Sequence, residues 1–257
     1  NLVGVFDMVI NPANPNTVFA ATTEGTYRTN DGGTTWSLVH NVPMATDLAM
    51  KPTDTSVLYI ACGNHTQLPK PLELSRAPRA WNEDQIVTRL WDANGHARGI
   101  LAPGGYICKV DPEGKTFELV SHGYRNEYDF AFNALGDIIT YDSDMEWDFG
   151  MPWYRPTRIC QVTSGSEFGW RTGNGKWSPL YPDNLPPVIN IGQGSPTNFI
   201  NGLNANFPEK YRKALFAFDW SFGIIYAIHL KPEGSTYSAT AEEFLSGAPL
   251  SLTDGII

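Results

Sequence analysis

The sequence has little positive charge, and what it has is scattered along the chain. Its 18 Lys and Arg are outnumbered by 27 Asp and Glu, which gives a net charge of −9. Nucleic-acid backbones are bound by clustered cationic side chains, so we expect no nucleic-acid partner. Long apolar runs are also missing; because a membrane span needs roughly 18 apolar residues, we expect no membrane span in this chain. The sequence shows neither an initiating Met nor a signal peptide, so we expect a processed chain or a fragment.

Cysteine is scarce and has no motif around it. Cys62, Cys108 and Cys160 are widely spaced and form no Cys-x-x-Cys pair. This spacing indicates neither a disulfide framework nor a zinc or haem site, and it favours three buried small apolar side chains. Redox chemistry in this chain would therefore require a bound organic cofactor.

Helical periodicity is rare, whereas short strand-like runs are frequent. Runs such as residues 17–21, 56–61 and 105–110 are bounded by Gly, Pro, Asn or Asp, and the 24 Gly and 19 Pro are spread along all 257 residues. Frequent turns between short strands are typical of an all-β fold. No composition shift marks a linker, so we expect a single domain over residues 1–257.

The sequence also repeats itself. Residues 7–21 match residues 47–61 at a constant offset of 40, and residues 129–141 carry the same pattern about two repeat lengths later. A period near 40 is the length of a four-stranded propeller blade. Asp254-Gly255-Ile256-Ile257 matches the opening of the repeat. We therefore predict a β-propeller of four-stranded blades, incomplete at about five to six blades, with an open edge or a partner strand at Asp254.

The segment from Thr29 to Trp36 reads Thr-Asn-Asp-Gly-Gly-Thr-Thr-Trp. Its Asp and Gly residues suit a tight hairpin turn in which the carboxylate accepts backbone N–H bonds and Gly takes positive φ. We expect Trp36 to give the following strand an apolar anchor. The segment resembles the Asp box of sialidase-like propeller repeats (BNR repeats), and this resemblance covers about residues 1–60.

A second set of motifs follows from about residue 59. In chain order they are Gly63-Asn64-His65-Thr66, Trp91-Asp92-Ala93-Asn94-Gly95-His96, Ala102-Pro103-Gly104-Gly105-Tyr106, Gly123-Tyr124-Arg125-Asn126-Glu127-Tyr128-Asp129, Tyr141-Asp142-Ser143-Asp144, Pro152-Trp153-Tyr154-Arg155, Glu167-Phe168-Gly169-Trp170-Arg171 and Phe218-Asp219-Trp220. Together they resemble the glucose/sorbosone dehydrogenase family, in particular its membrane-bound dehydrogenases of planctomycete-type bacteria. The resemblance covers residues 61–257. It implies a six-bladed propeller that binds pyrroloquinoline quinone (PQQ) and calcium on its axis.

The same resemblance suggests site residues. Arg125 and Asn126 match a pair that contacts the quinone, and Arg125 would also stabilise charge that develops during catalysis. Arg171 and Lys176 flank a Gly-rich loop that is long enough to reach the cofactor. The alternatives are that Arg125 ties the start of a blade to a neighbouring carboxylate and that Lys176 is a solvated surface residue.

Four acidic residues at alternate positions, Asp142, Asp144, Glu146 and Asp148, form the densest acidic cluster. On an extended strand alternate side chains share a face, so their carboxylates need a cation or arginines nearby. The resemblance places Asp142 and Asp144 in the calcium and quinone loop, with Asp144 also a cofactor contact. For Glu146 and Asp148 we favour ion pairs with arginines that follow in the sequence.

The proton-abstracting His of the family would fall within residues 45–50, which contain no His. Among the five His, at 40, 65, 96, 122 and 229, His65 and His96 follow strand-like runs in loops, as a substitute base would. Either residue could equally hold its loop together through hydrogen bonds.

Two functions follow from these observations. The first is a quinone-dependent oxidoreductase that oxidises a hydroxyl group of a sugar or polyol and passes the electrons to an external acceptor. We expect such a protein in the periplasm or outside the cell. The second is a non-catalytic propeller that binds a glycan or a protein through its loops.

Overall fold

A computed structural model describes residues 3–63, 66, 68–74, 76–77, 104–146, 153–171, 175–176, 179–182, 184–248 and 250–257, with the side chains of residues 171, 175 and 176 left out. The predicted all-β fold is confirmed, since strands account for all regular structure among these residues apart from the four-residue helix α1 (Glu209–Arg212). No helix in the described ranges is long and apolar enough to cross a membrane.

The strands form four sheets that we number blade 1 to blade 4. Blade 1 contains β1 (Val5–Ile10), β2 (Val18–Thr22), β3 (Thr26–Thr29) and β4 (Ser37–His40). Blade 2 contains β5 (Ala45–Lys51), β6 (Asp54–Cys62), β7 (Gly105–Val110) and β8 (Phe117–Tyr124), and the short parallel strand β12 (Ser166–Glu167) extends it. Blade 3 contains β9 (Phe130–Phe132), β10 (Ile138–Asp142), β11 (Thr157–Val162) and β15 (Ile189–Gly192). Blade 4 contains β16 (Pro196–Asn201), β17 (Leu215–Asp219), β18 (Ile224–Glu233) and β19 (Thr236–Ser246), and β13 (Trp170–Arg171) pairs with β14 (Gly175–Lys176) in a separate hairpin.

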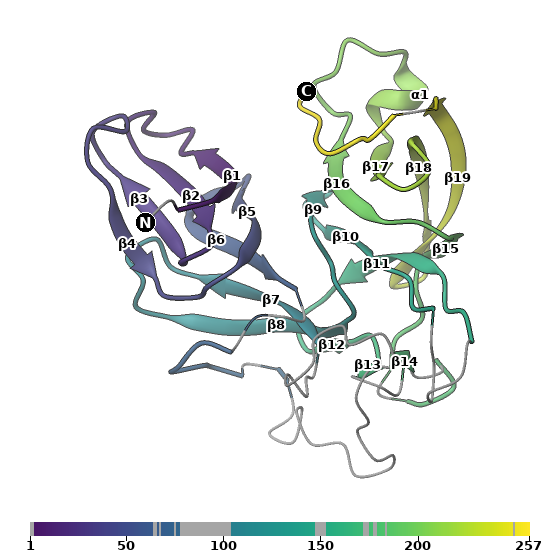
Figure 1. Cartoon of the computed structure of the whole chain (residues 1–257), viewed down its shortest axis with the longest axis horizontal. Helices are drawn as coiled ribbons and strands as arrows, with labels where there is room; N and C mark the ends of the chain where they lie inside the picture. The colour runs from purple at the N-terminus through teal and green to yellow at the C-terminus, as the bar shows by residue number, and fades with distance from the viewer. Residues whose placement is uncertain are drawn as a thin grey trace.

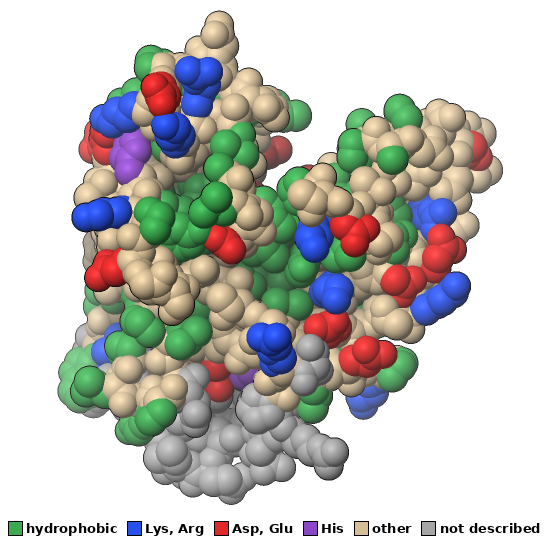
Figure 2. Space-filling model, turned by 180° about the vertical axis from the view of Figure 1, so that it is seen from behind, with side chains coloured by type: hydrophobic (Ala, Val, Ile, Leu, Met, Phe, Trp, Pro, Cys, Tyr) green, Lys and Arg blue, Asp and Glu red, His purple; other side chains and the backbone are tan. Residues whose placement is uncertain are grey.

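The first strand of each blade is the innermost one. β1 contacts β5, β5 contacts β9, and β9 contacts β16, so these strands follow one another around an axis. In Figure 1, blades 1 and 2 form one arm and blades 3 and 4 form the other, and the space-filling view shows the surface hollowed between the arms (Figure 2). The segment around Asp254 lies at the inner position that follows β16.

The internal repeat corresponds to matching strands. Residues 7–21 run through β1 and β2, residues 47–61 through β5 and β6, and residues 129–141 through β9 and β10. The junction between the two resemblances, near residue 60, falls inside blade 2, within β6. The two parts therefore share one hydrogen-bonded sheet.

Apolar clusters fill the spaces between adjacent blades. Along β6 the side chains alternate, with Leu58 and Ile60 in the cluster against blade 1 and Tyr59 and Ala61 in the cluster against blade 3. Alternate side chains of a strand point to opposite faces, so each central blade supplies two interfaces. The three Cys are free and buried in these clusters, which confirms the predicted structural role.

The predicted hairpin at Asp31 forms as expected. The Asp31 carboxylate accepts hydrogen bonds from the Thr35 N–H at 2.9 Å and from the Thr35 hydroxyl at 2.6 Å, and Gly32 and Gly33 take positive φ. These bonds lower the pKa of Asp31 to about 2. Trp36 donates to the Gly33 carbonyl at 3.1 Å, but 40% of it is exposed, so it is a weaker anchor than expected.

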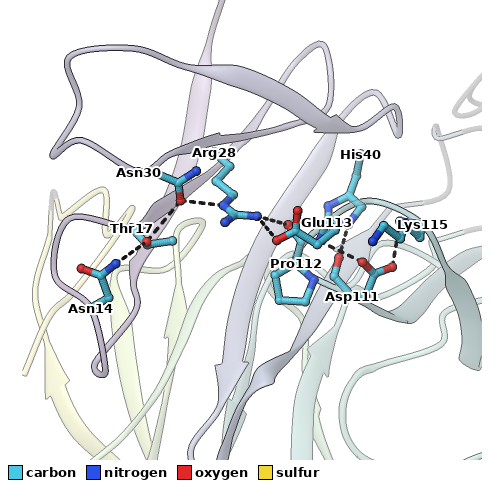
Figure 3. Close-up of polar contacts among 9 residues, drawn as sticks. All are labelled: Asn14, Thr17, Arg28, Asn30, His40, Asp111, Pro112, Glu113 and Lys115. Carbon is cyan, nitrogen blue, oxygen red and sulfur yellow. Dashed lines mark hydrogen bonds and ion pairs between the residues drawn. The ribbon is translucent and has the colours of Figure 1, made fainter.

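Polar contacts join blade 1 to the turn between β7 and β8 of blade 2 (Figure 3). Arg28 bonds the Pro112 carbonyl at 3.0 Å and pairs with Glu113, while Nε2 of the buried His40 lies 2.7 Å from the Asp111 carbonyl oxygen. The Asp111 carboxylate holds its own turn by accepting the N–H groups of residues 113, 115 and 116, as Asp31 does in blade 1.

Replacing His40 by Gln tests this interface. Burial lowers the pKa of His40 in the folded protein, so the stabilising effect of the neutral ring is complete above about pH 6.5 and is lost as the pH falls through the lower folded-state pKa. We expect the wild type to lose stability between about pH 7 and pH 5 more steeply than His40→Gln, by at most about 1.4 kcal/mol per pH unit. Urea unfolding at constant ionic strength measures this difference. Parallel curves for the two proteins would contradict it.

Candidate functional site

Several loops meet at the end of the propeller where β8, β10, β15 and β17 finish. We call this end the loop face and define it by residues 125–129, 143–146, 153–156, 193–195 and 220–223. Because strands alternate in direction within a blade, linkers between blades and loops after the second strands emerge at the same end. Most of the predicted site residues with described side chains belong to or adjoin this face.

Asp142, at the end of β10, is the centre of the loop face. Its Oδ1 accepts the backbone N–H groups of Arg125 at 2.9 Å and Asn126 at 3.0 Å, and its Oδ2 accepts Nε of Arg158 at 2.9 Å. Both side chains of this ion pair are buried, with exposed fractions of 6% for Arg158 and 0% for Asp142. The arginine also lies over the Phe168 ring, 5.7 Å from its centroid. The carboxylate therefore fixes the linker between blades 2 and 3.

Arg125 projects from that linker, and one of its donor groups has no partner among the described residues. Its Nη2 lies 3.5 Å from Oε2 of Glu146, a long contact with a carboxylate that is 53% exposed. The arginine side chain itself is only 14% exposed, and its buried Nε has no partner among the described residues. The contact with Glu146 agrees with the alternative that we kept open for Arg125, but this arginine precedes Glu146 in the sequence, whereas we favoured a partner that follows it.

Asn126 closes the linker against blade 2. Its carbonyl oxygen accepts the Ser143 hydroxyl at 3.0 Å. Its Oδ1 lies so close to Gly63 that a Cβ at that position would overlap it. A larger residue at position 63, directly after β6, would therefore require the Asn126 side chain to move.

Glu127 is a site residue that sequence reasoning missed. It is fully buried, and neither carboxyl oxygen has a hydrogen-bond partner among the described residues. Burial, together with the nearby Asp142, raises the pKa of Glu127 well above its ordinary value and so favours the neutral form of this carboxyl group. It packs against Gly105, where any Cβ would overlap its oxygens. The sequence offered only an acidic residue three positions before an inner strand, with no sign of its contact with Gly105.

The structure does not support Asp142 as a calcium ligand. Its oxygens already accept three donors, and the cation beside it is Arg158. Asp144 interacts instead with the Tyr154 hydroxyl, while Gly194 N–H lies 3.5 Å from its Oδ2. Within the described ranges no group of three or more His, Cys, Asp or Glu side chains is placed to hold a metal ion.

Several predicted residues cannot be placed. His65, His96 and Asp148 lie outside the described residues. Only the backbone is described for Arg171 and Lys176, which belong to the β13–β14 hairpin. The candidate bases therefore remain predictions.

The loop face also presents exposed aromatic side chains that we did not single out from the sequence. Trp153 is 56% exposed, Trp220 49% and Phe222 53%. The loop that carries Trp220 and Phe222 is rigid, since Asp219 accepts the Phe222 N–H at 2.7 Å and Trp220 donates its N–H to the Ser195 carbonyl at 3.0 Å. Exposed aromatic rings on a fixed loop suit stacking against a sugar.

No protein-family model and no curated protein sequence matches the chain. Solved structures do match. A glucose dehydrogenase superposes with a TM-score of 0.57 and 14% identity, over 94% of this chain and 71% of that chain. The PQQ domain of pyranose dehydrogenase from Coprinopsis cinerea, in its holo form, gives a TM-score of 0.52 and 9% identity, over 96% of this chain and 68% of that chain. The chain has a β-propeller fold. At these identities the likeness extends to the fold alone.

Replacing Asp142 by Asn tests its role in the loop face. The change leaves Arg158 buried without its counter-charge, so we expect the free energy of unfolding to fall by about 3 kcal/mol. As a control, Glu146→Gln breaks a half-exposed pair and should cost less than about 1 kcal/mol. Urea unfolding of the two variants measures both values. Equal losses would show that Asp142 is not the centre of this network.

Proposed function

We propose that this propeller binds an anionic quinone of the PQQ type at its loop face and oxidises a hydroxyl group of a sugar or polyol. The observation that carries the proposal is Arg125, a largely buried guanidinium group whose Nε has no partner among the described residues. Buried donors are normally satisfied, so an open one at a loop face marks a place for an acceptor. Two sugar dehydrogenases that share the fold give independent support.

Arg125 would bind a carboxylate or a developing oxyanion of the quinone through its planar fork of donors. Its backbone is fixed by Asp142, so the guanidinium group needs little reorganisation to do this. When bound, the quinone accepts the hydride that leaves the sugar carbon as its hydroxyl becomes a carbonyl. Asn126, Asp144, Arg171 and Lys176 are the other proposed contacts to the cofactor. We assign calcium no ligand on Asp142, because its oxygens are occupied.

The remaining parts of the proposal rest on the resemblance. His65 or His96 would take the proton of the sugar hydroxyl, and an external acceptor would reoxidise the quinone. A periplasmic or extracellular location would suit such an exchange.

A second candidate function is sugar or glycan binding without catalysis. It is favoured by the exposed Trp153, Trp220 and Phe222, which need neither a cofactor nor a base to bind a sugar ring. Both functions require a sugar site, but only the first requires a bound quinone.

Titration with PQQ in the presence of calcium distinguishes them. Cofactor absorbance reports binding, and reduction of an artificial acceptor by glucose reports turnover. We expect binding at micromolar PQQ, with Arg125→Ala weakening it about tenfold to a hundredfold because a hydrogen bond to a charged group is lost. The control Arg212→Ala removes an exposed arginine of α1 and should bind normally. Absence of binding, or equal binding by Arg125→Ala, would refute the quinone site.

Trp220→Ala tests the sugar site separately. The side chain is half exposed, so its removal should leave the melting temperature almost unchanged. We expect glycan binding to fall about tenfold, measured by calorimetry against an oligosaccharide panel, because one stacked ring is lost. Unchanged binding, with turnover also unchanged, would remove Trp220 from both candidate functions.

A further inference from the structure

A cavity runs along the propeller axis; its lining repeats in a regular way and does not include Arg125. Its narrower part, about 220 Å³ in volume, is lined by one pair of residues from each inner element. These pairs are Phe6-Asp7, Thr46-Asp47, Tyr128-Asp129, Thr197-Asn198 and Thr253-Asp254. A wider part of about 410 Å³ continues past the same Asp and Asn residues. The repeated Asp of the sequence therefore faces the axis from each of four inner elements, and Asn198 occupies the fifth equivalent place.

The lining carries negative charge and no balancing cation. Asp7, Asp47, Asp129 and Asp254 face the two parts of the cavity, and no Lys, Arg or His occurs among the described lining residues. Tyr128 is the other titratable lining residue. Burial, with Asp129 and Asp7 nearby, raises the pKa of Asp47 well above its ordinary value, and burial raises the pKa of Asp129 to about 7. These carboxylates repel one another when ionised.

Asn198 supplies an independent sign of a ligand. Its Nδ2 donates to Oδ2 of Asp129 at 2.8 Å and to Oδ1 of Asp254 at 2.9 Å, so both amide hydrogens are used. Its Oδ1 is buried without a partner among the described residues, in a side chain that is only 8% exposed. Oδ1 of Asn198 is therefore a buried acceptor, beside four carboxylates, for which the described residues supply neither a donor nor a cation.

We propose that the axial cavity binds a hydrated divalent cation, which the carboxylates and Asn198 hold through its water molecules. No group of three or more acidic side chains in the described ranges is placed to hold a bare ion, so the cation would keep most of its water. Magnesium suits the site because it takes oxygen ligands and gives up its water reluctantly. Six waters occupy about 180 Å³ at their liquid volume, which the narrower part of the cavity accommodates. The cation screens the repulsion between inner strands of both arms and so holds the blades together.

Magnesium binding to the whole chain tests this site. Calorimetric titration with MgCl2, in a background of choline chloride at constant ionic strength and pH 8, should show one site. Cobalt(III) hexammine, which resembles hydrated magnesium but does not exchange its ligands, should compete for that site. Magnesium without competition by the hexammine ion would overturn binding through water, and no magnesium binding at millimolar concentration would overturn the site itself.

Variants locate the binding. Asp254→Asn keeps an acceptor oxygen and lies in an exposed segment, so it should not disturb the packing of the blades. We expect it to weaken magnesium binding at least tenfold. Asp129→Asn, at a less exposed position than Asp254, should weaken it further. The matched control Glu233→Gln removes one exposed charge from the opposite end of blade 4 and should bind as the wild type does. Unchanged affinity in Asp254→Asn and Asp129→Asn, with normal circular dichroism, would overturn the proposal. PQQ binding is measured separately, so failure here leaves the loop-face proposal intact.

Discussion

Three of the four inner strands of this propeller, β5, β9 and β16, depend on a carboxylate from the blade before them. Asp7 lies 3.4 Å from the Leu48 N–H, Asp47 accepts the Phe130 N–H at 3.1 Å, and Asp129 accepts the Phe199 N–H at 2.8 Å. The innermost strand is the edge of its sheet, and its axis-facing N–H groups have no neighbouring strand to bond. A short acidic side chain from the previous inner strand accepts a hydrogen bond from one of these N–H groups. The same contact sets the distance and register between successive blades.

The loop face uses the same principle a few residues away. Asp142 accepts two backbone N–H groups of the linker that leads into β9, and Arg158 neutralises it. The backbone of the linker is therefore held in place without using the linker's own side chains. The Arg125 side chain also contacts Glu146 at 3.5 Å, but its Nε has no partner among the described residues and can be offered to a ligand. Binding residues carried by a rigid scaffold are typical of propeller loops.

The sequence predicted the repeat better than the site, although it did not place the repeated Asp residues at the axis. Asp7, Asp47, Asp129 and Asp254 stand out because each opens a repeat, but Asn198 was missed because it breaks the Asp pattern and long insertions disturb the 40-residue spacing before it. The turn at Asp111 was missed for a similar reason: it replaces the Gly-Gly and Trp of the box at Asp31 with a different sequence that makes the same carboxylate bonds. Glu127 and the role of Asp142 depend on neighbours distant in sequence, Gly105 and Arg158, which no local pattern links to them.

The charge at the axis requires an explanation beyond strand pairing. An Asn in place of each Asp would offer the same acceptor oxygen to the next N–H without any repulsion between neighbours. Hydrogen bonding alone would therefore favour the amide, and burial penalises the charged form further. Four carboxylates around one cavity are stable only if protons or a cation neutralise them, and the pKa of about 7 at Asp129 means that protons alone leave charge on the ring above neutral pH. Asn198 fits this reading, since its Nδ2 donates to both Asp129 and Asp254 while its buried Oδ1 has no partner among the described residues.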